Sequence, residues 1–279
     1  MHKNIALRIL YILTTTFYTL FFLISCSSSV KLTDALKTNT QDIERIRSMS
    51  HLDHTVVLAP IVIALEPTTQ QGNNAVTGEK VLNIDPDHFS KQLLQIFQTN
   101  NVFKSIEKLS TSPPKADLPQ AQGSKKKTAT DNTNKKLQIR EARAKKATLL
   151  MNVSVKKARL YCIGKNDAVL GNSAMWLCLG VPSLWGADID YGIEIIASVS
   201  FLDVASSPDF ATPIYSYEYP FKVEGGLNYL ERSSSIAIVV MPPQFCPDNL
   251  DKIETLILSN AQEQLLIKLA EQTKKEFGK

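Results

Sequence analysis

The stretch Tyr191-Gly-Ile-Glu-Ile-Ile-Ala-Ser-Val-Ser-Phe-Leu202 decides the fold of this chain of 279 residues. Apolar side chains recur at every second position, and those on one side are Ile193, Ile195, Ala197, Val199 and Phe201. Successive side chains of a β-strand point to opposite faces of its sheet. The period of two therefore predicts a strand with one face in a hydrophobic core.

Four further segments have strand character. Residues 148–160 and 213–223 flank the first strand, and the second of these places Tyr215, Tyr217 and Tyr219 on one face. Residues 102–109 alternate in the same way. Residues 55–65 are almost continuously apolar, which predicts a strand buried on both faces with Pro60 at a strand end or bulge.

Two segments predict helices. Asp85-Pro86 supplies a cap and a first-turn proline for a helix whose apolar side chains recur at helical spacing up to Phe97. Residues 249–276 form the strongest helix, with Asp248 as its expected cap. Its buried stripe is expected to contain Leu250, Ile253, Ile257, Ala261, Leu265 and Leu269. The fold class expected is α/β (α+β), with a mixed sheet of about four to five strands and two main helices packed on it.

The amino-terminal region has the pattern of an export signal. Residues 1–8 carry Lys3 and Arg8 and no acidic group, and residues 9–25 carry no charge. An ordinary signal would end in an Ala-x-Ala-like site, and none is present. A retained membrane helix needs about 20 apolar residues, whereas this run is shorter and is interrupted by threonines.

The run closes with Leu23, Ile24, Ser25 and Cys26, which resemble the lipobox of bacterial lipoproteins. The resemblance implies that a diacylglycerol joins the Cys26 sulfur and that the chain is cut before Cys26. It further implies that the new amine is acylated, with palmitate as the expected acyl group. Two or three acyl chains anchor a protein stably, whereas one does not. The alternative is an accidental cysteine at the end of an uncleaved helix.

We expect three regions: a signal peptide over residues 1–25, a polar tether over 26–52, and a single α/β domain over 53–279. A basic low-complexity insertion interrupts the domain at residues 111–147. It holds ten basic and three acidic residues, a net charge of 10 − 3 = +7. Up to residue 136 the insertion has too little apolar surface to offset the entropy that is lost when a chain becomes ordered, so we expect this long stretch to be disordered. Residues 137–146 could form a short exposed helix.

The chain carries four cysteines, of which Cys162, Cys178 and Cys246 follow the proposed anchor. In an oxidising compartment this odd number allows at most one disulfide and leaves one thiol. No Cys-x-x-Cys pair occurs, so neither a thioredoxin-like site nor a zinc ribbon is indicated.

The order of the predicted elements resembles that of one group of bacterial envelope proteins. The group includes the curli-secretion-channel lipoprotein, the amino-terminal domain of TolB and the lipoprotein activators of penicillin-binding proteins. Three segments carry the resemblance: residues 56–60, the helix leading into residues 101–106, and residues 201–205. Members of the group differ in role, so the resemblance implies a fold and an envelope location but no single activity.

No catalytic motif is found, and no metal ion or cofactor is expected. His51 and His54 lie close together with Asp53, but the group offers too few rigid ligands for a convincing metal site. Asp188 and Asp190 have a spacing that places them on one side of a strand. Paired acids can hydrolyse glycans, although a solvated strand end is the simpler interpretation.

Two segments are candidate interaction surfaces. Trp176 and Trp185 lie in an uncharged stretch, residues 168–187, which could face a partner or a membrane or could equally cap the sheet as core. The lysine run Lys125, Lys126 and Lys127 could bind anionic lipid head groups or acidic glycans. Nucleic acid is not expected as a partner because aromatic residues are not interleaved with the lysines.

The sequence therefore predicts a lipid-anchored envelope protein that acts as a binding or assembly module in the periplasm. Its expected partners are the membrane, through lipid on Cys26, and another envelope protein or a second copy of the chain. Ser27 after the anchor position favours the outer membrane, by resemblance to the enterobacterial sorting rule. The alternatives are an envelope glycan hydrolase that uses Asp188 or Asp190, and a subunit of an outer-membrane secretion assembly.

Overall fold

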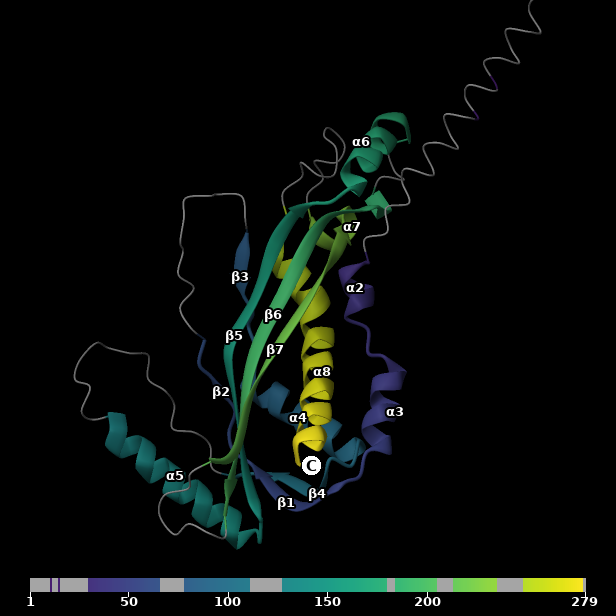
Figure 1. Ribbon diagram of the computed structural model, residues 1–279. Coiled ribbons are helices and arrows are strands. Elements are labelled where there is room, and N and C mark those ends of the chain that lie inside the picture. Colours follow the sequence, from purple (N-terminus) through teal and green to yellow (C-terminus); the bar gives the residue numbers. More distant parts are fainter. Residues whose placement is uncertain are drawn as a thin grey trace, which may run out of the picture.

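A computed structural model describes Tyr11, Thr15 and residues 30–65, 78–110, 127–179, 184–204, 213–234 and 248–277. The side chains of residues 127–135 and 178–179 are not described. Over the described residues the chain is an α+β fold, a mixed sheet with helices packed on it (Figure 1). The predicted fold class is confirmed.

The sheet has the strand order β4-β1-β5-β6-β7. These strands are β1 (Leu52–Leu58), β4 (Phe103–Lys108), β5 (Leu149–Lys165), β6 (Ala187–Asp203) and β7 (Pro213–Asn228). β1 runs parallel to both β4 and β5, whereas β6 runs antiparallel to its two neighbours, β5 and β7. Two short strands, β2 (Val62–Ile63) and β3 (Glu79–Val81), also pair with β5. Within the described ranges the sheet thus has seven strands, more than predicted, because strands as short as β2 and β3 show no period.

The central strand matches the prediction closely. All five apolar residues expected on the inner side of β6 have no exposed surface. β5 and β6 form a long hairpin whose connection carries helix α6 (Ala168–Leu179) at one end of the sheet (Figure 1). At the other end of the hairpin, Leu149 lies opposite Asp203.

Four helices pack on one face of the sheet and share its main core: α2 (Leu32–Ala35), α3 (Thr40–Ser48), α4 (Pro86–Thr99) and α8 (Leu250–Phe277). α4 begins after Asp85, whose carboxylate accepts hydrogen bonds from the backbone N–H groups of Asp87 and His88, as predicted. α8 runs along the sheet, and its predicted stripe is buried except for the half-buried Leu250.

The predicted cap of α8 is wrong by one residue. The Asn249 side-chain oxygen accepts a hydrogen bond of 3.0 Å from the Lys252 backbone N–H, which is the capping interaction. Asp248 instead forms an ion pair with Arg232. Both residue types are good caps, so the sequence alone could not separate the two neighbouring positions.

Lys274 joins three helices at the other end of α8. Its Nζ donates hydrogen bonds of 2.9–3.1 Å to the backbone carbonyls of Ile46, Met49 and Asn100. These carbonyls belong to the carboxyl ends of α3 and α4, where helix dipoles favour a positive charge. Burial lowers the pKa of the Lys274 ammonium. Lys274 thus holds α8, α3 and α4 together.

The prediction of a polar tether over residues 26–52 is wrong for its described part. Leu32, Leu36 and Ile46 have no exposed surface and belong to the main core. The backbone before α2 also extends the sheet: the Gly226 N–H donates a hydrogen bond of 3.0 Å to the Val30 carbonyl. Few apolar residues occur in this segment, but Leu32, Leu36 and Ile46 are spaced so that all three reach the core.

The disorder predicted up to residue 136 is wrong for residues 127–136, which are helical. Helix α5 (Lys127–Ala144) lies on the face of the sheet opposite α8. Ile139 and Ala142 are buried there against a second, smaller core. Arg143 and Lys145 also donate hydrogen bonds, to the Val204 and Lys108 carbonyls respectively. The helix over residues 137–146 is therefore docked, not exposed, and residues 111–126 lie outside the described residues.

The apolar run at residues 55–65 is only partly the buried strand that we predicted. β1 ends at Leu58, and Pro60 separates it from β2, in agreement with a proline at a strand end. Beyond the proline only one side of the segment stays in the core: Ile61 is buried, whereas Val62 is 54% exposed. The prediction of burial on both faces is wrong for this second half, because a continuous run of apolar residues does not show whether one face of a strand is covered or both.

We predict that Gly225→Ala weakens the attachment of the amino-terminal segment. A Cβ atom at Gly225 would lie 2.7 Å from the backbone of Leu32 and from the Val30 carbonyl oxygen, too close for either to remain in place. Urea unfolding should show a loss of about 1–3 kcal/mol, and trypsin should cleave at Lys31 or Lys37 sooner than in the wild type.

The matched control is Gly78→Ala, whose Cβ would lie 3.3 Å from only the flexible end of the Leu250 side chain. Equal stability and equal cleavage rates for the two variants would contradict the tight backbone contact at Gly225.

Candidate functional site

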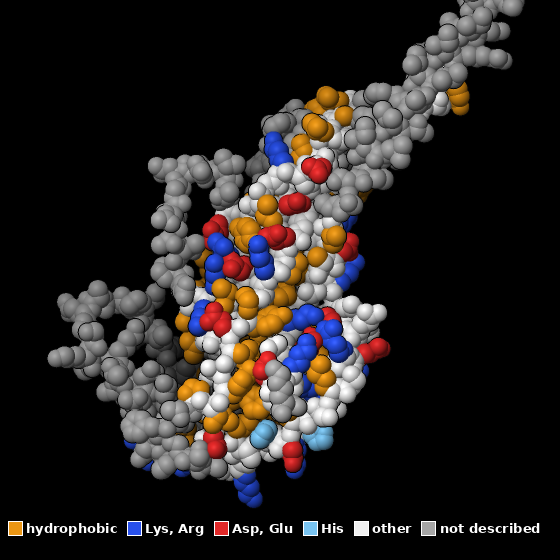
Figure 2. Space-filling view, viewed as in Figure 1, with side chains coloured by type: hydrophobic (Ala, Val, Ile, Leu, Met, Phe, Trp, Pro, Cys, Tyr) orange, Lys and Arg blue, Asp and Glu red, His pale blue; other side chains and the backbone are white. Residues whose placement is uncertain are grey.

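The most unusual surface of the described chain is at α6. This helix contains no charged residue. Leu170 and Leu177 are 78% and 74% exposed, the highest values among the large hydrophobic side chains described, and Trp185 just beyond the helix is 55% exposed. Figure 2 shows hydrophobic side chains gathered at the end of the molecule where Figure 1 places α6. We call Leu170, Leu177 and Trp185 the apolar tip.

Polar contacts at the base of α6 attach this helix to the sheet. The Asn166 side-chain oxygen accepts a hydrogen bond of 2.9 Å from the Ala168 N–H, and its amide group donates to the Ala187 carbonyl. Asn172 is buried and lies so close to Gly186 that a Cβ there would overlap its side chain. The helix therefore has a packed side and an exposed apolar side. The packed side agrees with the interpretation that the segment caps the sheet, whereas a partner or membrane facing the exposed side stays a prediction.

The apolar tip lies at the end of the sheet where the described domain begins. Val30 bonds to Gly226 of β7, Gly226 is opposite Asp190 of β6, and Asp190 accepts a hydrogen bond of 2.8 Å from Asn166 at the start of α6. Adjacent strands are about 4.8 Å apart. Three such steps place Val30 about 15 Å from the base of α6.

A buried ion cluster lies beneath this end of the sheet. Arg232, in α7 (Tyr229–Arg232), has no exposed surface. It donates hydrogen bonds of 3.4 Å to both carboxylate oxygens of Asp188 and one of 2.6 Å to Asp248. The cluster ties the beginning of β6 to α7 and to the residue before the cap of α8.

Burial and the neighbouring charges shift the pKa values of the groups in this cluster. Burial raises the pKa of the Asp188 carboxyl above its usual range, against the opposing effect of Arg232. Burial disfavours the charged form of Arg232, but Asp188 and Asp248 outweigh it and raise the arginine pKa. Burial also raises the pKa of the Tyr191 phenol, and the neighbouring Asp248 carboxylate adds to the effect. The cluster therefore keeps Arg232 charged and Tyr191 neutral.

Asp188 and Asp190 do not form the paired acids considered from the sequence. The pairing of β6 with β7 shifts register between Ala187 and Ile189. Asp188 is fully buried and bound to Arg232, whereas Asp190 is half-buried and bound to Asn166. The expectation that both lie on one side of the strand fails because of this irregularity.

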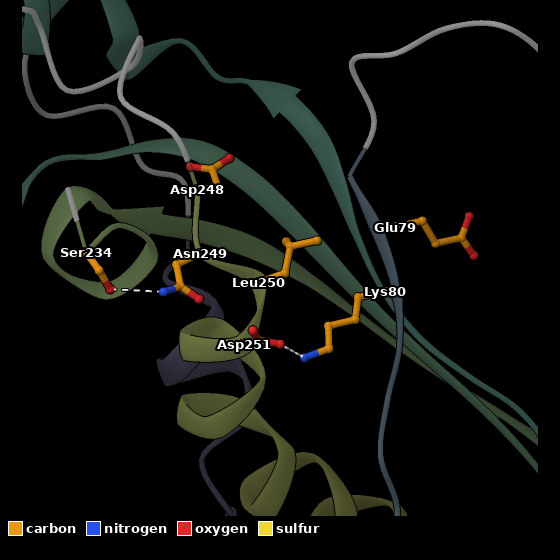
Figure 3. Close-up of a pocket in the computed structure, with 7 residues that line it drawn as sticks. All are labelled: Glu79, Lys80, Ser234, Asp248, Asn249, Leu250 and Asp251. Carbon is orange, nitrogen blue, oxygen red and sulfur yellow. Dashed lines mark hydrogen bonds and ion pairs between the residues drawn. The ribbon is translucent and has the colours of Figure 1, made fainter. Parts of the chain in front are cut away.

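An open depression of about 520 Å³ lies between β3 and the start of α8 (Figure 3). It is lined by Glu79, Lys80, Ser234, Asp248, Asn249, Leu250 and Asp251. Its polar side chains are engaged with protein groups: Lys80 with Asp251 and Glu254, and Asn249 with Ser234. Glu79 and Asp248 bind two arginines, Arg159 and Arg232. A ligand would have to displace these interactions.

The remaining sequence candidates are dispersed. His51 is exposed, and His54 packs edge-on against Phe277 with ring centroids 6.1 Å apart. Among the described residues no cluster of three or more His, Cys, Asp or Glu side chains is placed to hold a metal ion. Cys162 is a free thiol within the described chain, and the side chains of Cys178 and Cys246 are not described.

Several predicted residues fall outside the described chain. These are Leu23, Ile24, Ser25 and Cys26 of the lipobox, together with Lys125 and Lys126; Lys127 begins α5 without a described side chain. Trp176 is half-buried in α6. Within the described ranges no helix is both long and apolar enough to cross a bilayer. The exposure of Leu170 and Leu177 was not anticipated, because an uncharged segment in a sequence is also what a buried element shows.

Comparison with known proteins gives structural neighbours only. No family model matches the chain, and no curated protein matches it. A neuraminyllactose-binding hemagglutinin homolog from Helicobacter pylori has a TM-score of 0.35 and 10% identity, over 82% of this chain and 94% of that one.

The hypothetical protein CT253 from Chlamydia trachomatis has a TM-score of 0.31 and 7% identity, over 78% of this chain and 98% of that one. PelC from Paraburkholderia phytofirmans, solved as a dodecamer, has a TM-score of 0.29 and 10% identity, over 79% and 93% of the two chains. Likenesses this remote carry no conclusion about what this chain binds or how it assembles.

We predict that Arg232→Met destabilises the fold by about 3–5 kcal/mol, because it leaves the Asp188 carboxylate buried without its cation. Replacing both residues, Arg232→Met with Asp188→Leu, should restore part of the loss. Urea unfolding of the single and double variants measures both effects.

The control is Lys222→Met, which removes an exposed ion pair with Glu224 and should change stability by no more than about 1 kcal/mol. If Arg232→Met lost no more stability than this control, the buried cluster would have no structural role.

Proposed function

We propose that this protein is a lipid-anchored bacterial envelope protein that acts as a binding or assembly module next to the membrane. One observation carries the proposal. The lipobox-like Leu23–Cys26 ends an uncharged run behind a basic amino terminus, and the packed domain begins only four residues later, at Val30.

The short connection between Cys26 and Val30 limits how far the domain can lie from the membrane. Four residues of extended chain reach at most about 14 Å. With Cys26 held at the membrane surface, Val30 stays close to that surface, and so does the end of the sheet to which Val30 bonds. A domain held in this way acts on partners in or beside the membrane and does not sample the full depth of the periplasm. The outer membrane is the favoured location, because Ser27 follows the anchor position.

The binding role is supported by the character of the surface. The apolar tip is an exposed patch of large side chains, and patches of this kind mark interaction sites. The glycan-hydrolase alternative receives no support from geometry, since Asp188 is buried in an ion pair and Asp190 has a different partner. A partner among the envelope proteins, or a second copy of the chain, remains the proposal for what the module binds.

We predict that Cys26→Ala abolishes lipid attachment. Cells supplied with an alkyne fatty acid should label the wild-type protein, and mass spectrometry should find its mature amino terminus at an acylated Cys26. The variant should carry no label and should retain residues 1–25. The matched control is Cys162→Ala, which removes the thiol described as free and should be labelled as the wild type is.

A wild-type protein that begins at an unprocessed Met1, or that carries a free thiol at position 26, would refute the lipid anchor. The binding role has a separate test, crosslinking in intact cells with identification of what is captured. Capture of a second copy or of a defined envelope protein supports the module, whereas a chain that stays uncrosslinked across reagents of different length contradicts it.

A further inference from the structure

We infer that the apolar tip inserts into the surface of the same phospholipid bilayer that holds the anchor, so that the domain touches the membrane at two points. This inference rests on the proposed lipid anchor. The occupant that we assign to the exposed face of α6 is the interfacial layer of the bilayer, where head groups meet acyl chains.

The first argument is position. The chain from Cys26 to Val30 reaches at most about 14 Å, and Val30 lies about 15 Å from the base of α6 across adjacent strands. Both points belong to the same end of the sheet. A membrane that holds Cys26 therefore lies within reach of Leu170, Leu177 and Trp185.

The second argument is chemistry. An uncharged helix buries no charge when its exposed side enters the bilayer, and α6 has twelve residues without one charge. Leucine side chains favour the acyl region, and tryptophan is enriched where acyl chains meet head groups. The charged residues nearest in sequence, Lys165 and Asp167, are exposed at the base of the helix and would remain among the head groups.

The third argument is size. Twelve helical residues span about 18 Å, well short of the roughly 30 Å hydrocarbon core. α6 is thus suited to enter one leaflet but not to cross. The packing of Asn172 against Gly186 and the hydrogen bond from Asn166 to the Ala187 carbonyl keep it attached to the sheet, so the tip enters the bilayer as part of the domain.

A two-point attachment fits the physics of lipid anchoring. The acyl chains on Cys26 already anchor the protein stably, so the contribution of the tip is to the orientation of the domain. Lipid on Cys26 fixes the distance of the domain from the membrane, and the tip fixes its orientation. The opposite end of the sheet, where β5 begins at Leu149, then points away from the membrane.

The test uses the protein's own fluorescence, because its two tryptophans, Trp176 and Trp185, both lie at this end of the molecule. The full-length lipoprotein is reconstituted into vesicles of phosphatidylethanolamine and phosphatidylglycerol, with or without bromine on the acyl chains. We expect brominated lipids to quench the emission of the wild type. Trp176→Phe leaves Trp185 as the sole reporter, and it should be quenched as well.

Substitutions in the apolar tip distinguish membrane contact through the tip from membrane contact through the lipid anchor. The double variant Leu170→Asp with Leu177→Asp should lose the quenching while it still floats with the vesicles through its lipid. The matched control is Ile214→Asp. Ile214 has the same 55% exposure as Trp185 but lies at the opposite end of the sheet, where β7 begins, so this variant should be quenched as the wild type is.

The outcomes distinguish the two proposals. Emission that is equal in both kinds of vesicle overturns the membrane-inserted tip, whether or not the protein carries lipid. Emission at shorter wavelength without quenching means that a second copy covers the tip, which also overturns it. Quenching of a protein that mass spectrometry finds unlipidated would support the tip and refute the anchor.

Discussion

The backbone contact between the amino-terminal segment and the edge of β7 is the constraint on which the rest of this structure depends. Gly225 has no side chain, so Val30 and Leu32 can approach its backbone closely, and the Gly226 N–H bonds to the Val30 carbonyl. The contact covers one end of the β7 edge, where polar backbone groups would otherwise be unpaired. It also determines at which end of the sheet the amino-terminal segment joins the domain. That end is the one nearest the proposed anchor.

The helices that follow make this contact part of the core. Gln264 of α8 donates hydrogen bonds to the Ala35 and Lys37 carbonyls, and Lys268 binds Asp42. Lys274 then joins α8 to the ends of α3 and α4. Force applied at the amino terminus is therefore transmitted to α8 and the sheet and is not absorbed by a loose linker. In the proposed function this coupling lets the lipid position the whole domain.

Much of this fold is predictable because the pattern is local. The period of two in β6 and the stripe on α8 each lie within one element, and both are confirmed. The docking of α2 and α3 was missed because Leu32, Leu36 and Ile46 are too sparse to form a pattern, although each reaches the core. β2 and β3 are too short to show a period at all.

The candidate site also has one part that the sequence predicts and one part that it does not. Trp185 could be singled out from the sequence as a large aromatic residue in an uncharged segment. The exposure of Leu170 and Leu177 could not, because exposure depends on which side of α6 the sheet covers. The ion cluster joins Arg232 to residues that lie 44 and 16 positions away in sequence, so no local pattern connects them.

The central claim is that the domain begins at Val30, directly behind the proposed anchor. Amide hydrogen exchange of the full-length protein tests it most directly. The account predicts slow exchange at Gly226, Ala35 and Leu36, whose N–H groups bond to the Val30, Lys31 and Leu32 carbonyls; exchange at all three as fast as in an unstructured chain would contradict it.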